Sequence, residues 1–153
     1  MVRGGQFTVK CKHAEEVITM NEYIMTIDEG TTSARAIIFD HSGDIVSLAQ
    51  KEFTQFYPKP GWLEQDPIEI WTTTIEVIGK CMAQSGLNQK QIKAIGITNQ
   101  RETVVVWNKN TGIPVYRDIV WGDRRTAGYC DQLKAEGKEP MIKEKTGLIA
   151  DAY

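Results

Sequence analysis

The sequence has few of the features that mark several common classes of protein. Its three cysteines, Cys11, Cys81 and Cys130, lie far apart and form no C-x-x-C pair, which argues against a disulfide framework or a structural zinc site. Each is therefore expected to be a buried thiol. No basic run is longer than a pair and the net charge is −2, so the sequence offers no cationic surface for nucleic acid or anionic lipid. These absences favour a small-molecule partner.

Long apolar runs are missing as well. No stretch approaches the length of a membrane span, and residues 1–20 lack the uninterrupted apolar core of a secretory signal. We therefore expect no membrane span and a cytoplasmic location. The G-x-x-x-x-G-K-[ST] run of a P-loop is also absent, so a phosphate site in this chain would need another kind of loop.

The chain has 153 residues, of which 41% are hydrophobic, enough for one globular domain or part of one. Residues 1–19 show neither a strand nor a helix period. We expect them to be either an extension upstream of a natural start at Met20 or a poorly ordered arm. The sequence ends on an apolar run and Tyr153, so we expect residues 20–153 to be a partial domain cut at its C-terminal end.

Residues 23–40 carry the strongest local signal. Two apolar runs, 24–27 and 36–39, flank a polar segment centred on Gly30, which predicts a β-hairpin with a functional tip. Glycine suits a tight turn and leaves room for a ligand, so neighbouring amides and hydroxyls can converge on an anion. The candidate phosphate-facing residues are Asp28, Gly30, Thr31, Thr32, Ser33 and Arg35.

Within this set, Asp28 is the candidate ligand of a metal ion, because Mg²⁺ is usually held by one or two carboxylates together with water and substrate phosphates. The alternative is an ordinary hairpin whose Thr and Ser side chains satisfy their own backbone.

Residues 45–53 predict a third strand, which would complete an antiparallel meander. The prolines of residues 57–62 fix a loop that would present Tyr57 and Trp62.

A helix is expected to begin after Asp66, with Asp66 as its cap, Pro67 in its first position, Glu69 completing a capping box and Gly86 as its stop. Five apolar residues recur at helical spacing and are expected to pack against the sheet, with Trp71 in the core: Ile68, Trp71, Ile75, Ile78 and Met82.

Residues 92–98 form a nearly continuous apolar run, which predicts the central strand of the sheet, covered on both faces. Four polar residues, 99–102, follow at the strand end, where α/β sheets place their ligands. Arg101 and Glu102 together offer the donors and the acceptor that a polyhydroxyl compound needs. The alternative for these two residues is a surface ion pair.

Further strands are expected at 104–107 and 115–121. A helix capped by Asp123 should run to about residue 133, and a short helix should cover 138–146.

Five ordered blocks give the chain a family resemblance: IDEGTTSARAIIFD, YPKPGWLEQDPIEIW, AIGITNQRETVVVW, PVYRDIVWGDRRT and TGLIADAY. From Tyr23 to Tyr153 the chain resembles the N-terminal part of the FGGY carbohydrate kinases, and within that family the members that phosphorylate glycerol. The resemblance implies an α/β fold of the actin-like ATPase and ribonuclease H-like type, with a mixed sheet flanked by helices.

The same resemblance implies Mg²⁺-dependent transfer of phosphate from ATP to glycerol, giving sn-glycerol 3-phosphate and ADP, by an enzyme that is a homo-oligomer at full length. It places Asp28 and the hairpin loop against the nucleotide phosphates and the metal ion. It places Arg101, Glu102 and Tyr153 on the glycerol hydroxyls, and Trp121 against the carbon face of glycerol.

The resemblance also places the catalytic base beyond Tyr153, so no catalytic residue is expected in this chain and the isolated 153 residues should show no turnover. One hypothesis is therefore a working glycerol-phosphorylating kinase represented by a fragment. The other is an inactive remnant that keeps part of the ligand site. A binding module of the same fold with a role of its own is a third class, disfavoured because the glycerol-facing residues occur together.

Overall fold

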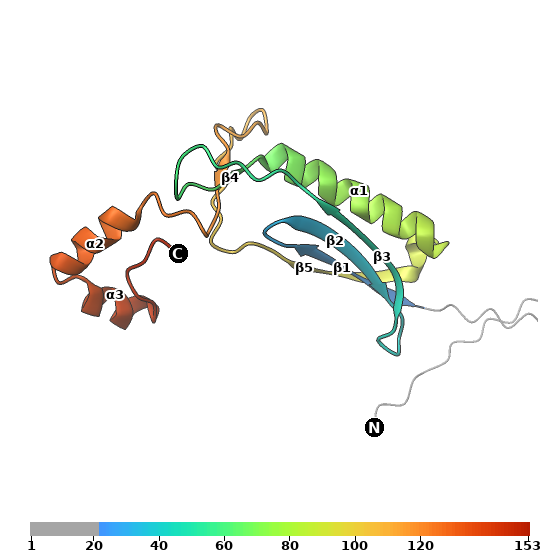
Figure 1. Ribbon diagram of the computed structural model, residues 1–153. Helices are drawn as coiled ribbons and strands as arrows, with labels where there is room; N and C mark the ends of the chain where they lie inside the picture. Colours follow the sequence, from blue (N-terminus) through green and yellow to red (C-terminus); the bar gives the residue numbers. More distant parts are fainter. Residues whose placement is uncertain (1–21) are drawn as a thin grey trace, which may run out of the picture.

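The structure is a computed structural model that describes residues 22–153. The expectations about residues 1–19, Met20 and Cys11 lie outside the described residues. Within the described part, one curved sheet carries a long helix on one face, and two short helices lie away from the sheet (Figure 1).

The sheet has four strands: β1 (Tyr23–Glu29), β2 (Ser33–Phe39), β3 (Ile45–Glu52) and β5 (Ile92–Thr98). Their order is β3-β2-β1-β5. The first three strands pair antiparallel, which confirms the predicted meander, and β5 pairs parallel to β1. The sheet is therefore mixed, as expected.

The prediction that β5 is the central, doubly covered strand is wrong. Within residues 22–153 it lies at the edge of the sheet with only β1 as a neighbour, and Ile95 and Ile97 are 57% and 71% exposed. An apolar run shows that a strand is built for burial, but it does not identify which segment buries it. No described element covers this strand.

The long helix α1 spans Pro67–Ser85 and begins and ends where the sequence predicts. The Asp66 carboxylate accepts a hydrogen bond from the Ile68 amide at 2.9 Å, and Gly86 ends the helix at a left-handed φ of 66°. The predicted capping box is wrong, because Glu69 Oε1 accepts instead from the backbone amide and the hydroxyl of Thr54, just beyond β3.

The apolar stripe predicted on α1 is also largely wrong. Thr73, Val77 and Cys81 are the buried residues of the helix, whereas Trp71 is 62% exposed. Ile68 and Ile75 are about half exposed, and only Ile78 and Met82 of the predicted stripe pack beside the core. The helix has two apolar sides, and the sheet covers the one that contains the smaller residues.

The core lies between α1 and the meander. It consists of Met25, Ala34, Ala36, Ile38, Ala49, Phe53, Val77 and Cys81. The alanines on β2 and β3 let the helix approach the sheet closely. Cys81 is a buried free thiol, as expected, and Cys130 is a half-buried free thiol.

A second, two-stranded sheet pairs β4 (Glu64–Gln65) antiparallel with β6 (Asp118–Ile119). A short 3-10 helix, η1 (Gln89–Gln91), leads into β5. The strand predicted over 115–121 shrinks to the two residues of β6, and the one predicted over 104–107 is reduced to isolated bridges of Val104 and Trp107. Trp107 bridges to Pro114, which has no N–H to extend a ladder.

Two short helices follow, α2 (Ala127–Ala135) and α3 (Glu139–Thr146). The second agrees with the prediction, but Asp123 does not cap the first. Its carboxylate binds the Leu63 amide and the side chain of Arg125 instead, and Thr126 occupies the cap position. Among the described residues, no helix combines the length and the apolar character needed to span a bilayer.

Candidate substrate site

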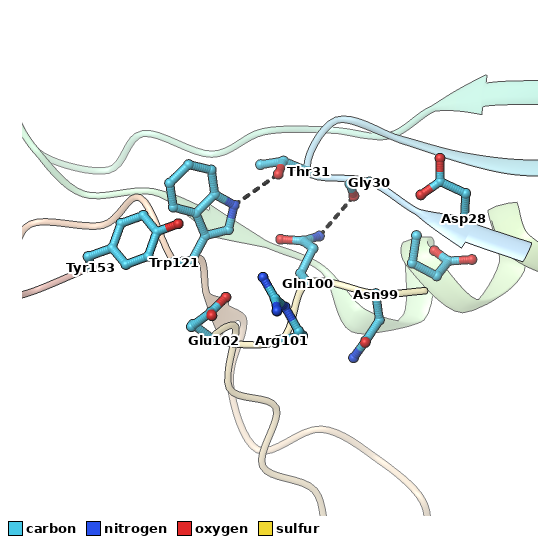
Figure 2. Close-up of a pocket in the computed structure, with 10 residues that line it drawn as sticks. Asp28, Gly30, Thr31, Asn99, Gln100, Arg101, Glu102, Trp121 and Tyr153 are labelled. Atoms are coloured by element: carbon cyan, nitrogen blue, oxygen red, sulfur yellow. Dashed lines mark hydrogen bonds between the residues drawn. The ribbon is translucent and has the colours of Figure 1, made fainter. Parts of the chain in front are cut away.

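The parallel pairing of β1 and β5 creates the site. Asp28 pairs with Thr98 in register, so the β1–β2 turn and the polar segment after β5 emerge side by side at one edge of the sheet. A pocket of about 220 Å³ lies between them (Figure 2). It is lined by Asp28, Glu29, Gly30, Thr31, Asn99, Gln100, Arg101, Glu102, Trp121 and Tyr153.

The turn between β1 and β2 needs glycine at position 30 because of a close backbone approach. The Gly30 amide donates to the Ser33 carbonyl at 3.0 Å, and a Cβ on Gly30 would lie 3.1 Å from that same oxygen. An alanine would have to push the two backbone segments apart. The turn therefore brings its backbone to the pocket with no side chain in front of it.

Thr31 is the loop residue most firmly held by other segments. Its hydroxyl accepts from Trp121 Nε1 at 2.9 Å, and its carbonyl accepts from the side-chain amides of Gln55 and Gln65. Side chains from elsewhere in the chain thus satisfy this turn, rather than its own Thr and Ser residues alone. The Thr31 hydroxyl proton keeps a free direction, because the hydroxyl only accepts in these contacts.

The six loop residues predicted to face phosphate divide into two groups. Asp28, Gly30 and Thr31 line the pocket, whereas Thr32, Ser33 and Arg35 do not. Ser33 is buried and its Oγ accepts from Gln50 Nε2 at 3.1 Å. The role of this set toward phosphate stays a prediction.

Asp28 and Arg35 are partners across the hairpin. Their Cα atoms pair in the β1–β2 register, and Arg35 Nη2 lies 3.2 Å from Asp28 Oδ2. Asp28 Oδ1 keeps its lone pairs. In the described residues, no three His, Cys, Asp or Glu side chains gather to hold a metal ion. The role of Asp28 as a metal ligand stays a prediction.

Arg101 and Glu102 point into the site without forming a pair. Both are exposed, and within residues 22–153 neither lies within ion-pair distance of an opposite charge. The alternative of a surface ion pair is therefore wrong for this structure. An unpaired guanidinium next to an unpaired carboxylate can donate to and accept from the same hydroxyl-rich ligand.

Trp121 and Tyr153 form the aromatic wall of the pocket. Their rings meet edge to face, with centroids 5.1 Å apart and an interplanar angle of 68°. The Trp121 backbone amide donates to Thr103 Oγ1 at 3.2 Å, which fixes the wall against the segment after β5. The structure thus brings all four predicted substrate residues to one pocket (Figure 2).

Three lining residues were not predicted as site residues: Glu29, Asn99 and Gln100. Burial raises the pKa of Glu29, an effect that the hydrogen bond from Thr74 opposes and the nearby charge of Asp28 reinforces. Thr74 Oγ1 donates to Glu29 Oε1 at 2.7 Å, and Oε2 has no partner among the described residues. The available signal was the position of these three residues at the ends of β1 and β5.

A buried ionic cluster supports the segment that carries Trp121. Arg125 bonds to Glu64 Oε1 and to Asp123 Oδ2, both at 2.8 Å, and the two carboxylates are 0% and 3% exposed. Burial alone would raise the pKa of Asp123, but hydrogen bonds from Arg125 and from the Leu63 amide lower it. The Arg125 guanidinium also stacks 3.8 Å above the ring centre of Trp62. The cluster joins β4 to residues 118–125.

Comparison with known families gives a match over nearly all of the described chain. The model of the FGGY family of carbohydrate kinases, N-terminal domain, matches residues 23–153. Similar curated proteins include glycerol kinases from Petrotoga mobilis and Carboxydothermus hydrogenoformans. Each is 61% identical, over 134 and 132 residues. These matches cover 88% and 86% of this chain but only 27% and 26% of the relatives.

Solved structures agree. The chain superposes on Plasmodium falciparum glycerol kinase with ADP at a TM-score of 0.80 and 35% identity, covering 87% of this chain and 27% of that one. A gluconate kinase from Lactobacillus acidophilus, at 24% identity and a TM-score of 0.77, shares the fold. The fold is thus the actin-like, ribonuclease H-like α/β type, and the chain spans about a quarter of the length of these relatives.

Proposed function

Because the chain belongs to the FGGY family of carbohydrate kinases, we propose that it supplies one wall of the active site of an ATP-dependent glycerol kinase. The reaction transfers a phosphoryl group from ATP to a terminal hydroxyl of glycerol, giving sn-glycerol 3-phosphate and ADP. The observation that carries the proposal is the unpaired Arg101 and Glu102 facing the Trp121–Tyr153 wall in one pocket.

The pocket suits a small polyol. Its volume of about 220 Å³ lies below the range of roughly 300–1,000 Å³ typical of pockets for drug-sized ligands. Arg101 would donate to glycerol oxygens, Glu102 would accept from glycerol hydroxyls, and the Trp121 face would cover the C–H groups. Because each hydroxyl then has a fixed partner, a ligand that lacks one leaves a charged group unsatisfied.

The Gly30–Thr31 turn lies beside the Trp121–Tyr153 wall, where the transferred phosphoryl group would pass. Its backbone, together with the free direction of the Thr31 hydroxyl proton, would face the phosphates. Asp28 would hold Mg²⁺, through water or directly. When bound, this ion neutralises phosphate charge during transfer. Catalysis of phosphoryl transfer is largely positioning and charge stabilisation, which is what these residues offer.

Mg²⁺ dependence, a cytoplasmic location and a homo-oligomeric full-length enzyme are parts of this proposal. So is the absence of turnover from the isolated 153 residues, because the family resemblance places the base in a segment beyond Tyr153. The competing hypothesis is a remnant that binds glycerol and never transfers phosphate.

A chimaera tests whether this segment can form part of a working kinase. Residues 23–153 would replace the matching segment of the Petrotoga mobilis glycerol kinase, and glycerol-dependent ADP release would be measured. We expect activity within about tenfold of the parent, since 61% of the matched residues are identical. Arg101→Ala in the chimaera should reduce kcat/KM by on the order of 10³ or more, because a polar site loses its fixed donors.

The control is Arg124→Ala, which removes an exposed arginine paired with Asp151. A folded chimaera without glycerol-dependent ADP release would contradict the proposed role of this segment. An unchanged kcat/KM in Arg101→Ala would refute the substrate role of that residue.

A further inference from the structure

The two sides of the pocket are joined by a closed ring of hydrogen bonds. The ring runs through Thr31, Gln65, Gln100, Thr103 and Trp121. Trp121 enters it twice, through its indole Nε1 to the Thr31 hydroxyl and through its backbone amide to Thr103 Oγ1. Thr31 also enters twice, through its hydroxyl and its carbonyl. The ring therefore joins the Gly30–Thr31 turn, which is proposed to face phosphate, to Trp121, which is proposed to cover the polyol.

The two glutamines can take only one orientation in this ring. Gln65 Nε2 meets the Thr31 carbonyl, and Gln100 Nε2 meets the Gly30 carbonyl at 3.1 Å. Carbonyl oxygens only accept, so each amide nitrogen must face its carbonyl. Gln65 Oε1 then accepts from Gln100 Nε2 at 2.9 Å, and Gln100 Oε1 accepts from the Thr103 hydroxyl at 3.0 Å. Every bond in the ring points in a defined direction.

Gln65 is the buried centre of this arrangement. It is 0% exposed, and its second amide N–H donates to Gln55 Oε1 at 2.8 Å, so both of its donors and its oxygen are engaged. A buried amide costs free energy unless its hydrogen bonds are all made, and an apolar side chain would fill the space without that requirement. Gln65 also follows Glu64 on β4, which the Arg125 cluster holds in place.

We propose that Gln65 is a positioning residue that couples the polyol side of the pocket to the phosphate-facing turn. It holds the Gly30–Thr31 backbone in register with Trp121 and with the segment of Arg101 and Glu102. A ligand that orders one side then orders the other. The names of the two ligands rest on the proposed function. The mechanical coupling rests on the hydrogen bonds alone.

The first test needs no ligand. In the ¹⁵N-labelled 153-residue chain, the solvent exchange of the Trp121 indole N–H reports whether the ring is closed. Gln65→Leu removes the ring bonds to Thr31 and Gln100, and Gln100→Leu removes those to Gln65 and Thr103. In both variants this exchange should become about three- to tenfold faster, the factor expected from one net hydrogen bond. Exchange of the Ile38 amide in the core should stay unchanged, which excludes global loosening as the cause.

Two further variants complete this test. Gln50→Leu is the matched control, because Gln50 donates to Ser33 Oγ beside the same turn but lies outside the ring. It should leave Trp121 exchange at the wild-type rate. Gln65→Glu should match the exchange rate of the wild type at the same pH only at low pH, where its protonated carboxyl can donate to the Thr31 carbonyl. Wild-type exchange in both leucine variants would overturn the proposal, as would equal acceleration in the Gln50 control.

The second test adds glycerol to the same samples. In the wild type, glycerol should shift the amide signals of Arg101 and Glu102 and also those of Gly30 and Thr31. In Gln65→Leu the shifts of the first pair should persist and those of the second pair should become smaller, because the Trp121–Thr31 bond remains but the rest of the ring is open. Wild-type shifts confined to Arg101 and Glu102 would refute the coupling. If glycerol shifts no signal in the wild type, the glycerol assignment fails for this chain, while the ligand-free exchange still decides whether the ring exists.

Discussion

The indole Nε1 of Trp121 donates to the hydroxyl of Thr31 at 2.9 Å, across 90 positions of sequence. Trp121, which is proposed to cover the carbon face of glycerol, therefore bonds directly to the Gly30–Thr31 turn, which is proposed to face phosphate. This contact makes the pocket one mechanical unit rather than two neighbouring surfaces, because neither side can move without stretching it. Trp121 has both a packing and an orienting role, and the two roles can be separated by mutation.

Trp121→Phe keeps the aromatic face and removes the N–H. One neutral hydrogen bond contributes about 1 kcal/mol net, so KM for glycerol in the chimaera should rise about fivefold. Trp121→Ala removes the aromatic face as well and should raise KM for glycerol far more. Trp107→Phe is the control, since Trp107 is 59% exposed and does not line the pocket. An equal rise in KM in the phenylalanine and alanine variants would mean that the packing role of Trp121 is negligible.

Arg125→Met should destabilise the fold strongly. It leaves Asp123 buried without its cation and Glu64 with only Arg117 Nη1, 3.9 Å away, and breaking a buried pair from one side costs about 3–5 kcal/mol. Arg124→Met removes the neighbouring, exposed arginine paired with Asp151 and should change the stability far less, because water screens an exposed pair. Urea unfolding of both variants gives the comparison, and similar losses would contradict the role assigned to the cluster.

The elements that could be predicted from sequence are those specified by local chemistry. The caps of α1 are an Asp66 side chain and a glycine with positive φ, and both depend on residues within one helical turn of each end. The antiparallel meander of β1, β2 and β3 could be predicted from their apolar runs and from the turn residues between them. Of the four predicted substrate residues, Arg101 and Glu102 could be proposed from their place at a strand end. Trp121 and Tyr153 came only from the family resemblance, since positions 101 and 153 are too far apart for spacing to relate them.

The features that could not be predicted depend on which segments are close in space. The sequence shows two apolar sides on α1 and cannot say that the one with Thr73, Val77 and Cys81 meets the sheet. The same holds for β5, whose apolar run predicts burial that no described segment provides. Gln65 carried no pattern at all, and Gln100 carried only its place after β5, because a hydrogen-bond ring has no period in the sequence.

Asp118→Asn should stabilise the chain at neutral pH. Asp118 is 1% exposed, and neither carboxylate oxygen has a hydrogen-bond partner among the described residues. Burial raises its pKa above the ordinary 3.8, against the opposing effect of the nearby amides of Asp118 and Gln65. A carboxyl group buried without hydrogen-bond partners costs free energy, most of all when it is ionised, so its replacement by a neutral amide should contribute about 1–3 kcal/mol.

The pH dependence of this effect has a defined sign. The pKa of Asp118 is higher in the folded chain than in the unfolded chain. Its contribution to stability is therefore fully present at a pH below the unfolded-state pKa and is lost as the pH rises through the folded-state pKa. The stability difference between Asp118→Asn and the wild type should therefore be small near pH 3.8 and grow upward from there. Urea unfolding at several pH values measures it. A difference that shrinks as pH rises would contradict the assignment.

Trp71→Gln should reduce self-association of the isolated chain without weakening its fold. Trp71 is 62% exposed on a side of α1 that also presents Ile68 and Ile75. On the adjoining sheet, Ile95 pairs in register with the buried Met25 on the α1 face and is itself 57% exposed. Exposed apolar side chains of this kind, together with a free strand edge, promote association.

The measurement is sedimentation velocity over a concentration series, combined with urea unfolding. Trp71→Gln should shift association to higher concentration and change the free energy of unfolding by no more than about 0.5 kcal/mol, as for other surface substitutions. Val77→Ala on the buried side is the control and should cost about 2 kcal/mol or more, because it opens a cavity in the core. A comparable loss of stability in Trp71→Gln would show that Trp71 packs in the core, as its spacing in the sequence predicts.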